Sequence, residues 1–152
     1  MKTMAKCVIR KMEVSDVDHV MEVERASFTT PWTTDIFYQE LLDNKHAHYF
    51  VLQLDEQIIG YIGTWIVIDD AQITNIAIMP GFRGHKLGEK LFGYTVQYAL
   101  QLGVKRLSLE VRQSNIPAQR LYQKFGLVPG GIRKNYYTDN QEDAIVMWVN
   151  LK

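Results

Sequence analysis

The sequence contains little cysteine and little proline, and its charges cancel. Its 152 residues include one cysteine, four prolines, 17 basic and 17 acidic residues. The lone Cys7 excludes an intrachain disulfide and a cysteine cluster with zinc spacing, which favours a reducing compartment. Balanced charge disfavours a generic polyanion binder, so we expect no direct nucleic-acid partner. A local basic pocket for a phosphate-bearing ligand is compatible with this balance.

Long apolar runs are also missing. The longest apolar-rich run, 58–68, is interrupted by Gly60, Gly63 and Thr64 and is far shorter than the roughly 20 residues of a membrane helix. No apolar stretch of a signal peptide follows residues 1–6. Because there is no repeat, low-complexity tract or linker, we expect residues 1–152 to form a single domain in the cytoplasm, without membrane contact.

The residues that are present suffice for a normal core, since 47% are apolar and 22% are charged. Periodicity, strand-forming residues and cap signals predict the element order βααβββαβαββ. Strands are expected at 6–12, 47–54, 59–68, 72–78, 104–111, 127–137 and 144–151. Helices are expected at 15–28, from Thr33 or Thr34 through Leu42, at 86–102, and from Ser114 through Phe125. This order predicts a layered α/β domain with a mixed sheet, in which 72–111 forms a right-handed parallel crossover.

The connection between the strand at 72–78 and the helix at 86–102 has the residues of an anion site. Its sequence is Met79-Pro80-Gly81-Phe82-Arg83-Gly84-His85-Lys86-Leu87-Gly88. The first turn of a helix has free N–H groups and the positive end of the helix dipole, and small residues let a phosphate approach the backbone. The glycine patterns of Walker A and Rossmann loops are absent. An ordinary strand–helix connection with solvated basic residues is the alternative.

In this element order the connection resembles the acetyl-CoA signature of the GCN5-related N-acetyltransferase (GNAT) superfamily, Arg/Gln-x-x-Gly-x-Gly/Ala. It matches at Arg83 and Gly88, whereas Lys86 replaces the middle glycine and must adopt a negative φ or be strained. The resemblance implies a GNAT fold, a mixed, mostly antiparallel seven-stranded sheet flanked by four helices. It also implies acetyl-CoA as cosubstrate and no metal. The implied cofactor-binding residues are Ile76, Ala77, Ile78, Arg83, Gly84, His85, Lys86, Leu87, Gly88 and Glu89.

A carboxylate and a tyrosine could supply the chemistry of acetyl transfer. Glu110 lies near the end of a strand, and Tyr122 lies in the following helix. An α-amine, with a pKa of about 7.7–8.0, is mostly protonated at neutral pH, and Glu110 could take its proton directly or through a water. The hydroxyl of Tyr122, with a pKa near 10, could protonate the departing thiolate. A salt-bridged strand end and a core-edge aromatic are the structural alternatives.

Three further runs resemble the RimI family, bacterial acetyltransferases that act on the N-terminal alanine of small-subunit ribosomal protein 18. They are Leu109-Glu110-Val111-Arg112-x-Ser114-Asn115, Leu121-Tyr122-x-x-Phe125-Gly126 and Arg133-Lys134-Asn135-Tyr136-Tyr137. The similarity covers nearly the whole chain. It implies Glu110 as proton acceptor, Tyr122 as proton donor, Asn115 as a hydrogen-bond partner of CoA, and a ribosomal-protein N-terminus as the substrate partner. We expect a monomer or a weak dimer.

Aromatic residues in two distant segments could enclose the acceptor. Phe28 and Trp32 lie between the first two predicted helices, and Tyr136 and Tyr137 end the penultimate predicted strand. Such a cage would exclude a bulky first residue, although the same aromatics could simply complete the core. The acidic turn at Asp139, Glu142 and Asp143 is either a solvated surface turn or a site that attracts a basic ribosomal-protein tail.

Other functions stay open at this point. His46 and His48 would share one face of a strand, but without a third ligand they do not predict a metal site. Among enzymes, the alternative is broader acetylation of protein N-termini or small amines. Among other classes of protein, it is a non-catalytic CoA-binding partner subunit.

Overall fold

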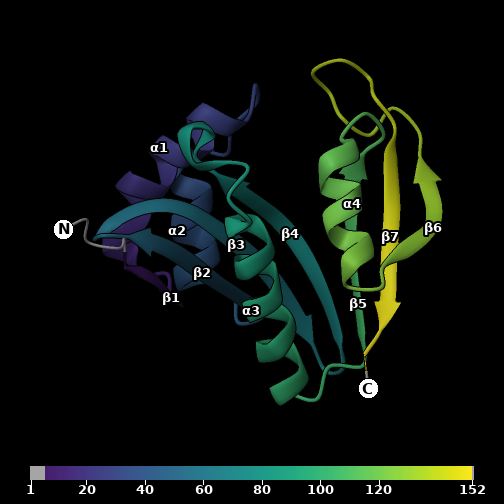
Figure 1. Ribbon diagram of the computed structural model, residues 1–152, viewed down its shortest axis with the longest axis horizontal. Coiled ribbons are helices and arrows are strands. Elements are labelled where there is room, and N and C mark those ends of the chain that lie inside the picture. The colour runs from purple at the N-terminus through teal and green to yellow at the C-terminus, as the bar shows by residue number, and fades with distance from the viewer. Residues whose placement is uncertain (1–5, 152) are drawn as a thin grey trace.

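The computed structural model describes residues 6–151, whose seven strands form one sheet in the order β1-β2-β3-β4-β5-β7-β6 (Figure 1). The strands are β1 Cys7–Lys11, β2 Ala47–Leu54, β3 Gln57–Val67, β4 Asp70–Ile78, β5 Arg106–Arg112, β6 Val128–Arg133 and β7 Ala144–Asn150. The helices are α1 Val17–Ser27, α2 Thr34–Leu42, α3 Leu87–Gln101 and α4 Ile116–Lys124, with 3-10 turns at Val14–Asp16 and Pro80–Phe82. The predicted element order, mixed sheet and four helices are confirmed.

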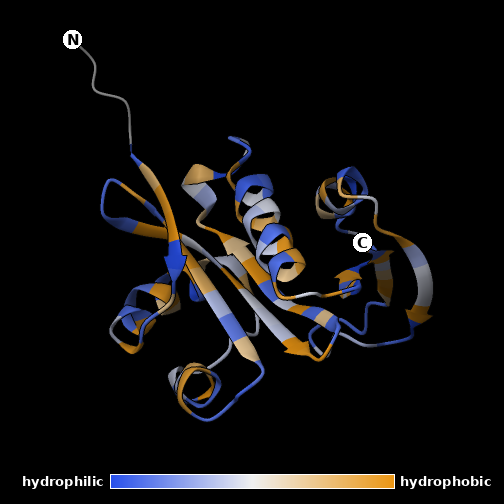
Figure 2. Ribbon diagram, turned by 90° about the horizontal axis from the view of Figure 1, so that it is seen from below, coloured by the Kyte–Doolittle hydropathy of each residue, from blue (hydrophilic) through white to orange (hydrophobic). Residues whose placement is uncertain are grey.

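The helices cover the sheet unequally (Figure 2). α1 and α2 pack on one face of β2, β3 and β4 around an apolar cluster that includes Val20, Phe37 and Tyr61. α3 and α4 lie on the opposite face, over a second cluster that includes Leu91, Leu107 and Tyr122. We call β1–β4 with α1, α2 and α3 the N-terminal arm, and β5, β6 and β7 with α4 the C-terminal arm. The C-terminal arm therefore has a helix on one face only.

The two arms join through a short parallel pairing. β4 pairs with β5 only from Asp70 opposite Arg106 to Ile73 opposite Leu109, although β4 continues to Ile78 and β5 to Arg112. The next residue of β4, Thr74, has no partner in the β3 register, so a bulge lies where the strands separate. Beyond this point β4 and β5 diverge, as the ribbon shows (Figure 1). We call this opening the splay.

Three expected boundaries are wrong for local reasons. The turn between β3 and β4 consists of Ile68 and Asp69, so Asp70 already belongs to β4. Asn115, rather than Ser114, caps α4, because its Oδ1 accepts the N–H of Ala118 at 3.2 Å. β6 ends at Arg133 rather than at residue 137, since Asn135 has a φ of 54° and turns the chain.

β6 forms one edge of the sheet and is exposed along its whole length. Its pairing with β7 is interrupted between Pro129 and Gly131. The indole of Trp148 approaches Gly130 so closely that a Cβ there would lie 2.4 Å from its Cδ1. Glycine is therefore required at position 130 by the close approach of a neighbouring ring.

Candidate active site

Glu110 lies on β5 immediately beyond the last residue that pairs with β4. Its neighbours Leu109 and Val111 point into the core beneath α3 and α4, so alternation places Glu110 on the face without a helix. The side chain is 15% exposed, and its Oε1 lies 3.1 Å from Nε of Arg133. Gln72 of β4 lies 3.5 Å from Oε2. The carboxylate is thus held beside the splay but stays within reach of solvent.

Tyr122 approaches the splay from the other side of the sheet. It lies on α4, is 6% exposed, and packs against Phe92 of α3 with ring centroids 5.2 Å apart. Burial, with a smaller contribution from nearby Tyr137, raises the pKa of Tyr122 well above its usual value. Among residues 6–151, none acts on its pKa through a hydrogen bond. The hydroxyl therefore keeps its proton at neutral pH and has that proton free to donate.

Tyr136 and Tyr137 lie in the loop 134–143, on the side of the sheet that carries Glu110. Their rings are 5.1 Å apart and nearly perpendicular. Burial raises the pKa of Tyr137 to about 12, and the charge of Glu110 adds to this effect. The same charge acts on Tyr136, after the larger effect of burial, and raises its pKa as well. Arg133 lies 3.1 Å from Glu110 and 5.9 Å from the ring centre of Tyr136, so the structure brings the predicted base and the second aromatic wall together.

The first aromatic wall reaches the same region. Phe28 ends α1 and is exposed, whereas Trp32 is partly buried with its ring centroid 5.4 Å from that of Phe37. Between them, Oγ1 of Thr29 donates to Oδ2 of Asp139 at 2.7 Å. This bond joins the link 28–33 to the loop 134–143. Trp32 therefore contributes to the core and also lies in a segment that borders the splay.

Arg112 organises the second wall and was not singled out by the sequence. Its guanidinium lies 2.8 Å from Asp139 and 3.3 Å from Glu142, and 4.0 Å from the ring centre of Tyr137. Glu142 also accepts the N–H of Ser114 at 2.6 Å. Hydrogen bonds from Thr29 and Arg112 lower the pKa of Asp139, and those from Ser114 and Arg112 lower the pKa of Glu142. Asp139 and Glu142 accept hydrogen bonds from other residues of the chain, so the acidic turn stabilises the conformation of the loop 134–143.

The opposite side of the splay is the free edge of β4. The N–H of Met79 bonds to the carbonyl of Ile59 on β3 at 2.7 Å. Because main-chain groups alternate along a strand, those of Ala77 also face β3, and those of Ile76 and Ile78 face the splay. The Ile78 carbonyl there accepts Nε of Arg83 at 2.8 Å. Both main-chain groups of Ile76 and the N–H of Ile78 are thus positioned to pair with an extended ligand.

The connection from β4 to α3 ends in two left-handed residues. Gly84 has a φ of 83° and Lys86 a φ of 61°, so Lys86 takes the strained alternative. Lys86 precedes the first turn of α3 without a side-chain cap, and the N–H groups of Leu87, Gly88 and Glu89 have no acceptor in residues 6–151. A Cβ at Gly88 would meet only ordinary contacts, at 3.6 Å or more. The partly exposed first turn fits an anionic group.

Three other predicted cofactor residues have distinct surroundings. Arg83 donates to Ile78 and, at 3.2 Å, to Oγ of Ser27, which directs it toward α1. His85 is exposed beside the first turn of α3. Asn115 uses its Oδ1 to cap α4, so only its amide nitrogen is available to a ligand.

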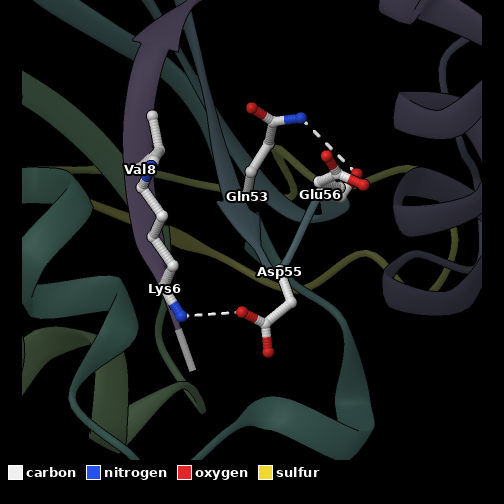
Figure 3. Close-up of a pocket in the computed structure, with 5 residues that line it drawn as sticks. All are labelled: Lys6, Val8, Gln53, Asp55 and Glu56. Carbon is white, nitrogen blue, oxygen red and sulfur yellow. Dashed lines mark hydrogen bonds between the residues drawn. The ribbon is translucent and has the colours of Figure 1, made fainter. Parts of the chain in front are cut away.

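The remaining features lie elsewhere. A hollow lined by Lys6, Val8, Gln53, Asp55 and Glu56 lies at β1, at the opposite edge of the sheet from the C-terminal arm (Figure 3). Within residues 6–151 there is no group of three or more metal-ligating side chains, and His48 instead pairs with the hydroxyl of Tyr98 at 2.8 Å. None of the helices in the same residues has the length and apolar character needed to cross a membrane.

The fold, the splay and the loop before α3 define a class that sequence comparison also identifies. A sequence model of the acetyltransferase (GNAT) family matches residues 17–127, and the chain belongs to this family. The expectation of a GNAT fold and of an acetyltransferase is therefore confirmed.

Particular relatives confirm the narrower resemblance to the RimI family. The chain is 60% identical, over 99% of both proteins, to a Bacillus subtilis (strain 168) protein named "Putative ribosomal protein bS18-alanine N-acetyltransferase". It is 37% identical to the ribosomal protein bS18-alanine N-acetyltransferase of Haemophilus influenzae, over 92% of this chain and 96% of that protein. The crystal structure of the Escherichia coli ribosomal-protein-S18-alanine N-acetyltransferase matches with a TM-score of 0.90 and 30% identity, covering 97% of this chain and 95% of that one.

Proposed function

We propose that this protein transfers the acetyl group of acetyl-CoA to the α-amine of the N-terminal alanine of ribosomal protein bS18. The full-length similarity to enzymes with this printed activity supports the reaction and the substrate. The single structural observation that carries the proposal is the splay, with Glu110 on one face of the sheet and Tyr122 on the other.

The residues on the donor side fit an acyl-CoA. Acetyl-CoA would supply the acetyl thioester. The free groups of Ile76 and Ile78 would hold its extended arm as an added strand, and the first turn of α3 would hold its phosphates. Lys86, exposed at that turn, would add positive charge. The amide nitrogen of Asn115 would donate a further hydrogen bond.

The acceptor would lie on the open face of the C-terminal arm, beside Glu110. The aromatic walls, Phe28 and Trp32 on one side and Tyr136 and Tyr137 on the other, would border its first residue. A small alanine side chain suits such an enclosure better than a bulky one. An α-amine is also deprotonated more readily than a lysine amine, whose pKa is about 10.4.

The chemical roles follow from the two environments. Glu110 would take a proton from the α-ammonium group, directly or through a water, so that the nitrogen lone pair can attack the thioester carbonyl. Tyr122 would direct its proton to the sulfur as the carbon–sulfur bond breaks. The high pKa of Tyr122 keeps the hydroxyl protonated before this step. The nitrogen of the adduct loses its second proton as the amide forms, and this proton passes to the tyrosinate, directly or through water. Glu110 then releases its proton to solvent, so both residues return to their starting states.

The direct test combines acetyl-CoA with peptides that begin with alanine, serine or leucine, in the context of the bS18 N-terminus. Intact mass should show one added acetyl group on the alanine peptide, and thiol release should match it in amount. Equal acetylation of all three peptides would favour a broader N-terminal acetyltransferase. Binding of acetyl-CoA without any product would favour a non-catalytic partner subunit.

A further inference from the structure

Glu24 is a buried carboxylate for which the proposed mechanism has no role. It lies in the last turn of α1 and is 2% exposed. The other buried carboxylate in residues 6–151, that of Asp16, is neutralised by Arg10 at 2.8 Å. Glu24 has no cation within ion-pair distance in the same residues. Burying a carboxylate without a counter-charge costs stability, so its surroundings must compensate through hydrogen bonds.

The two oxygens of Glu24 hold two separate parts of the molecule. Oε2 accepts the main-chain N–H of Trp32 at 2.8 Å, and Oε1 accepts the hydroxyl of Tyr61, which is fully buried on β3. The main-chain carbonyl of Glu24 accepts the N–H of Phe28 at 3.1 Å. Glu24 thus binds both ends of the link 28–33 that carries the first aromatic wall.

The hydrogen bonds continue from Tyr61 to the splay. Nδ2 of Asn75 donates to the hydroxyl of Tyr61 at 2.6 Å. Asn75 lies on β4 next to the bulge at Thr74, just beyond the last residue that pairs with β5. Glu24, Tyr61 and Asn75 therefore connect the wall of the acceptor site to the point where β4 leaves the sheet, immediately before the edge at Ile76 and Ile78.

We propose that Glu24 is a positioning residue that fixes the acceptor-binding link 28–33 relative to the donor-binding edge of β4. This inference rests on the proposed function, because it assigns the acceptor to the link and the acetyl donor to β4. It predicts that loss of the carboxylate displaces Trp32 and weakens acceptor binding, while the donor edge, held by its pairing with β3, keeps its affinity for acetyl-CoA.

The test compares Glu24→Met, which approximately keeps the volume but removes both acceptor oxygens, with Glu24→Gln, which keeps one. The matched control is Glu22→Gln, an exposed position on the same helix. Because the N–H of Trp32 would lose its acceptor, we expect Glu24→Met to raise the KM of the alanine peptide about tenfold. We expect Glu24→Gln to raise it less and Glu22→Gln to leave it unchanged. The KM of acetyl-CoA should stay within about twofold throughout.

A second readout does not depend on turnover. Amide hydrogen exchange in residues 28–33 should accelerate in Glu24→Met, whereas exchange in the first two turns of α1 should not. Peptide and acetyl-CoA KM values that rise together, or an unchanged peptide KM with native exchange in 28–33, would overturn the inference. If Glu24→Met does not fold, Tyr61→Phe, which removes the donor to Oε1, is judged by the same criteria. A wild-type protein that binds acetyl-CoA but acetylates no peptide would contradict the proposed function, and the exchange result alone would then decide whether Glu24 positions the link.

Discussion

Each arm of the sheet contains a carboxylate of interest, and the two carboxylates differ in burial and in the charge of their partners. In the N-terminal arm Glu24 is enclosed between α1 and β3, and its partners are the uncharged donors of Trp32 and Tyr61. In the C-terminal arm Glu110 lies on a face without a helix, beside the charged and largely exposed Arg133. The first arrangement suits the proposed positioning role, and the second leaves the proposed base open to an acceptor. The arm with helices on both faces of the sheet thus buries its carboxylate, whereas the arm with a helix on one face leaves its carboxylate accessible.

The largest effect should come from Glu110→Gln, which removes the proposed base but keeps the shape of the side chain. General-base catalysis contributes roughly 10²–10⁴ in rate, so kcat/KM for the alanine peptide should fall at least about 100-fold at neutral pH. The measurement is kcat/KM for the alanine peptide, followed by thiol release at saturating acetyl-CoA. Glu56→Gln, in the exposed turn between β2 and β3, is the control and should retain native activity. Native turnover in Glu110→Gln would remove the distinction between the two arms.

Tyr122→Phe should lower kcat by about 10- to 100-fold while changing stability little. The ring is buried, but the hydroxyl is not among the buried polar atoms of residues 6–151 that lack a partner, so its removal leaves no buried group unsatisfied. The measurements are kcat and the thermal midpoint. Tyr94→Phe, on the exposed side of α3, provides the control. A large loss of stability with unchanged kcat would mean that Tyr122 is a core residue only.

Arg112→Met should loosen the loop 134–143 and raise the KM of the peptide about fivefold, without a comparable change for acetyl-CoA. Arg106→Met is a close control, because Arg106 lies on the same strand and also stacks on a ring, that of Trp148 at 4.7 Å. The low pKa values of Asp139 and Glu142 in the folded protein make their ion pairs stabilising above the ordinary carboxyl range. The stability difference between native and Arg112→Met should therefore shrink as the pH falls through these lowered values. A difference that persists in acid would show that stacking on Tyr137 dominates.

The smallest expected effect is a difference in how the two buried carboxylates of the N-terminal arm, Glu24 and Asp16, change stability with pH. Burial raises the pKa of Glu24, so the folded state holds more protons than the unfolded chain above about pH 4.3, and stability declines as the pH rises through that window. The thermal midpoint of Glu24→Gln minus that of the native protein should therefore increase by about 2 °C from pH 4 to pH 7.

Asp16→Asn should behave in the opposite way. The hydrogen bond from Arg10 lowers the pKa of Asp16, so this pair stabilises the native protein at neutral pH and loses its effect as the pH falls through the lowered value. The native protein should be more stable than Asp16→Asn at pH 7, and the gap should narrow in acid. Parallel pH profiles for Glu24→Gln and Asp16→Asn would contradict both assignments.

Much of the fold could be predicted because it depends on local patterns. The spacing of Leu87, Leu91 and Tyr98 predicts α3, and Gly126, with a φ of 89°, ends α4 as expected. The splay could not be predicted from residues alone, because nothing in the composition of β4 or β5 shows that their pairing stops at Ile73 and Leu109. It depends on a bulge and on which strands are neighbours.

The site divides in the same way. Glu110, Tyr122 and the aromatic residues of the two walls can be identified because each lies in a short local run, and their roles remain proposals. Arg112 and Glu24 were missed, because their partners are distant in sequence: Arg112 pairs with Asp139 and Glu142, and Glu24 with Tyr61. The sequence shows that Lys86 replaces a glycine of the signature. Its left-handed conformation could not be read from the sequence, because it depends on the path of the connection between β4 and α3.

The interruption of β6 has a consequence for assembly. An exposed edge strand offers main-chain groups to a strand of another molecule, and long regular edges promote aggregation. Here the proline at 129 supplies no N–H, and the irregularity beside Gly130 breaks the spacing that an added strand would need. Pro129 and this irregularity thus make β6 a poor template for an added strand, and the irregularity tolerates no side chain at position 130 because the indole of Trp148 fills that space.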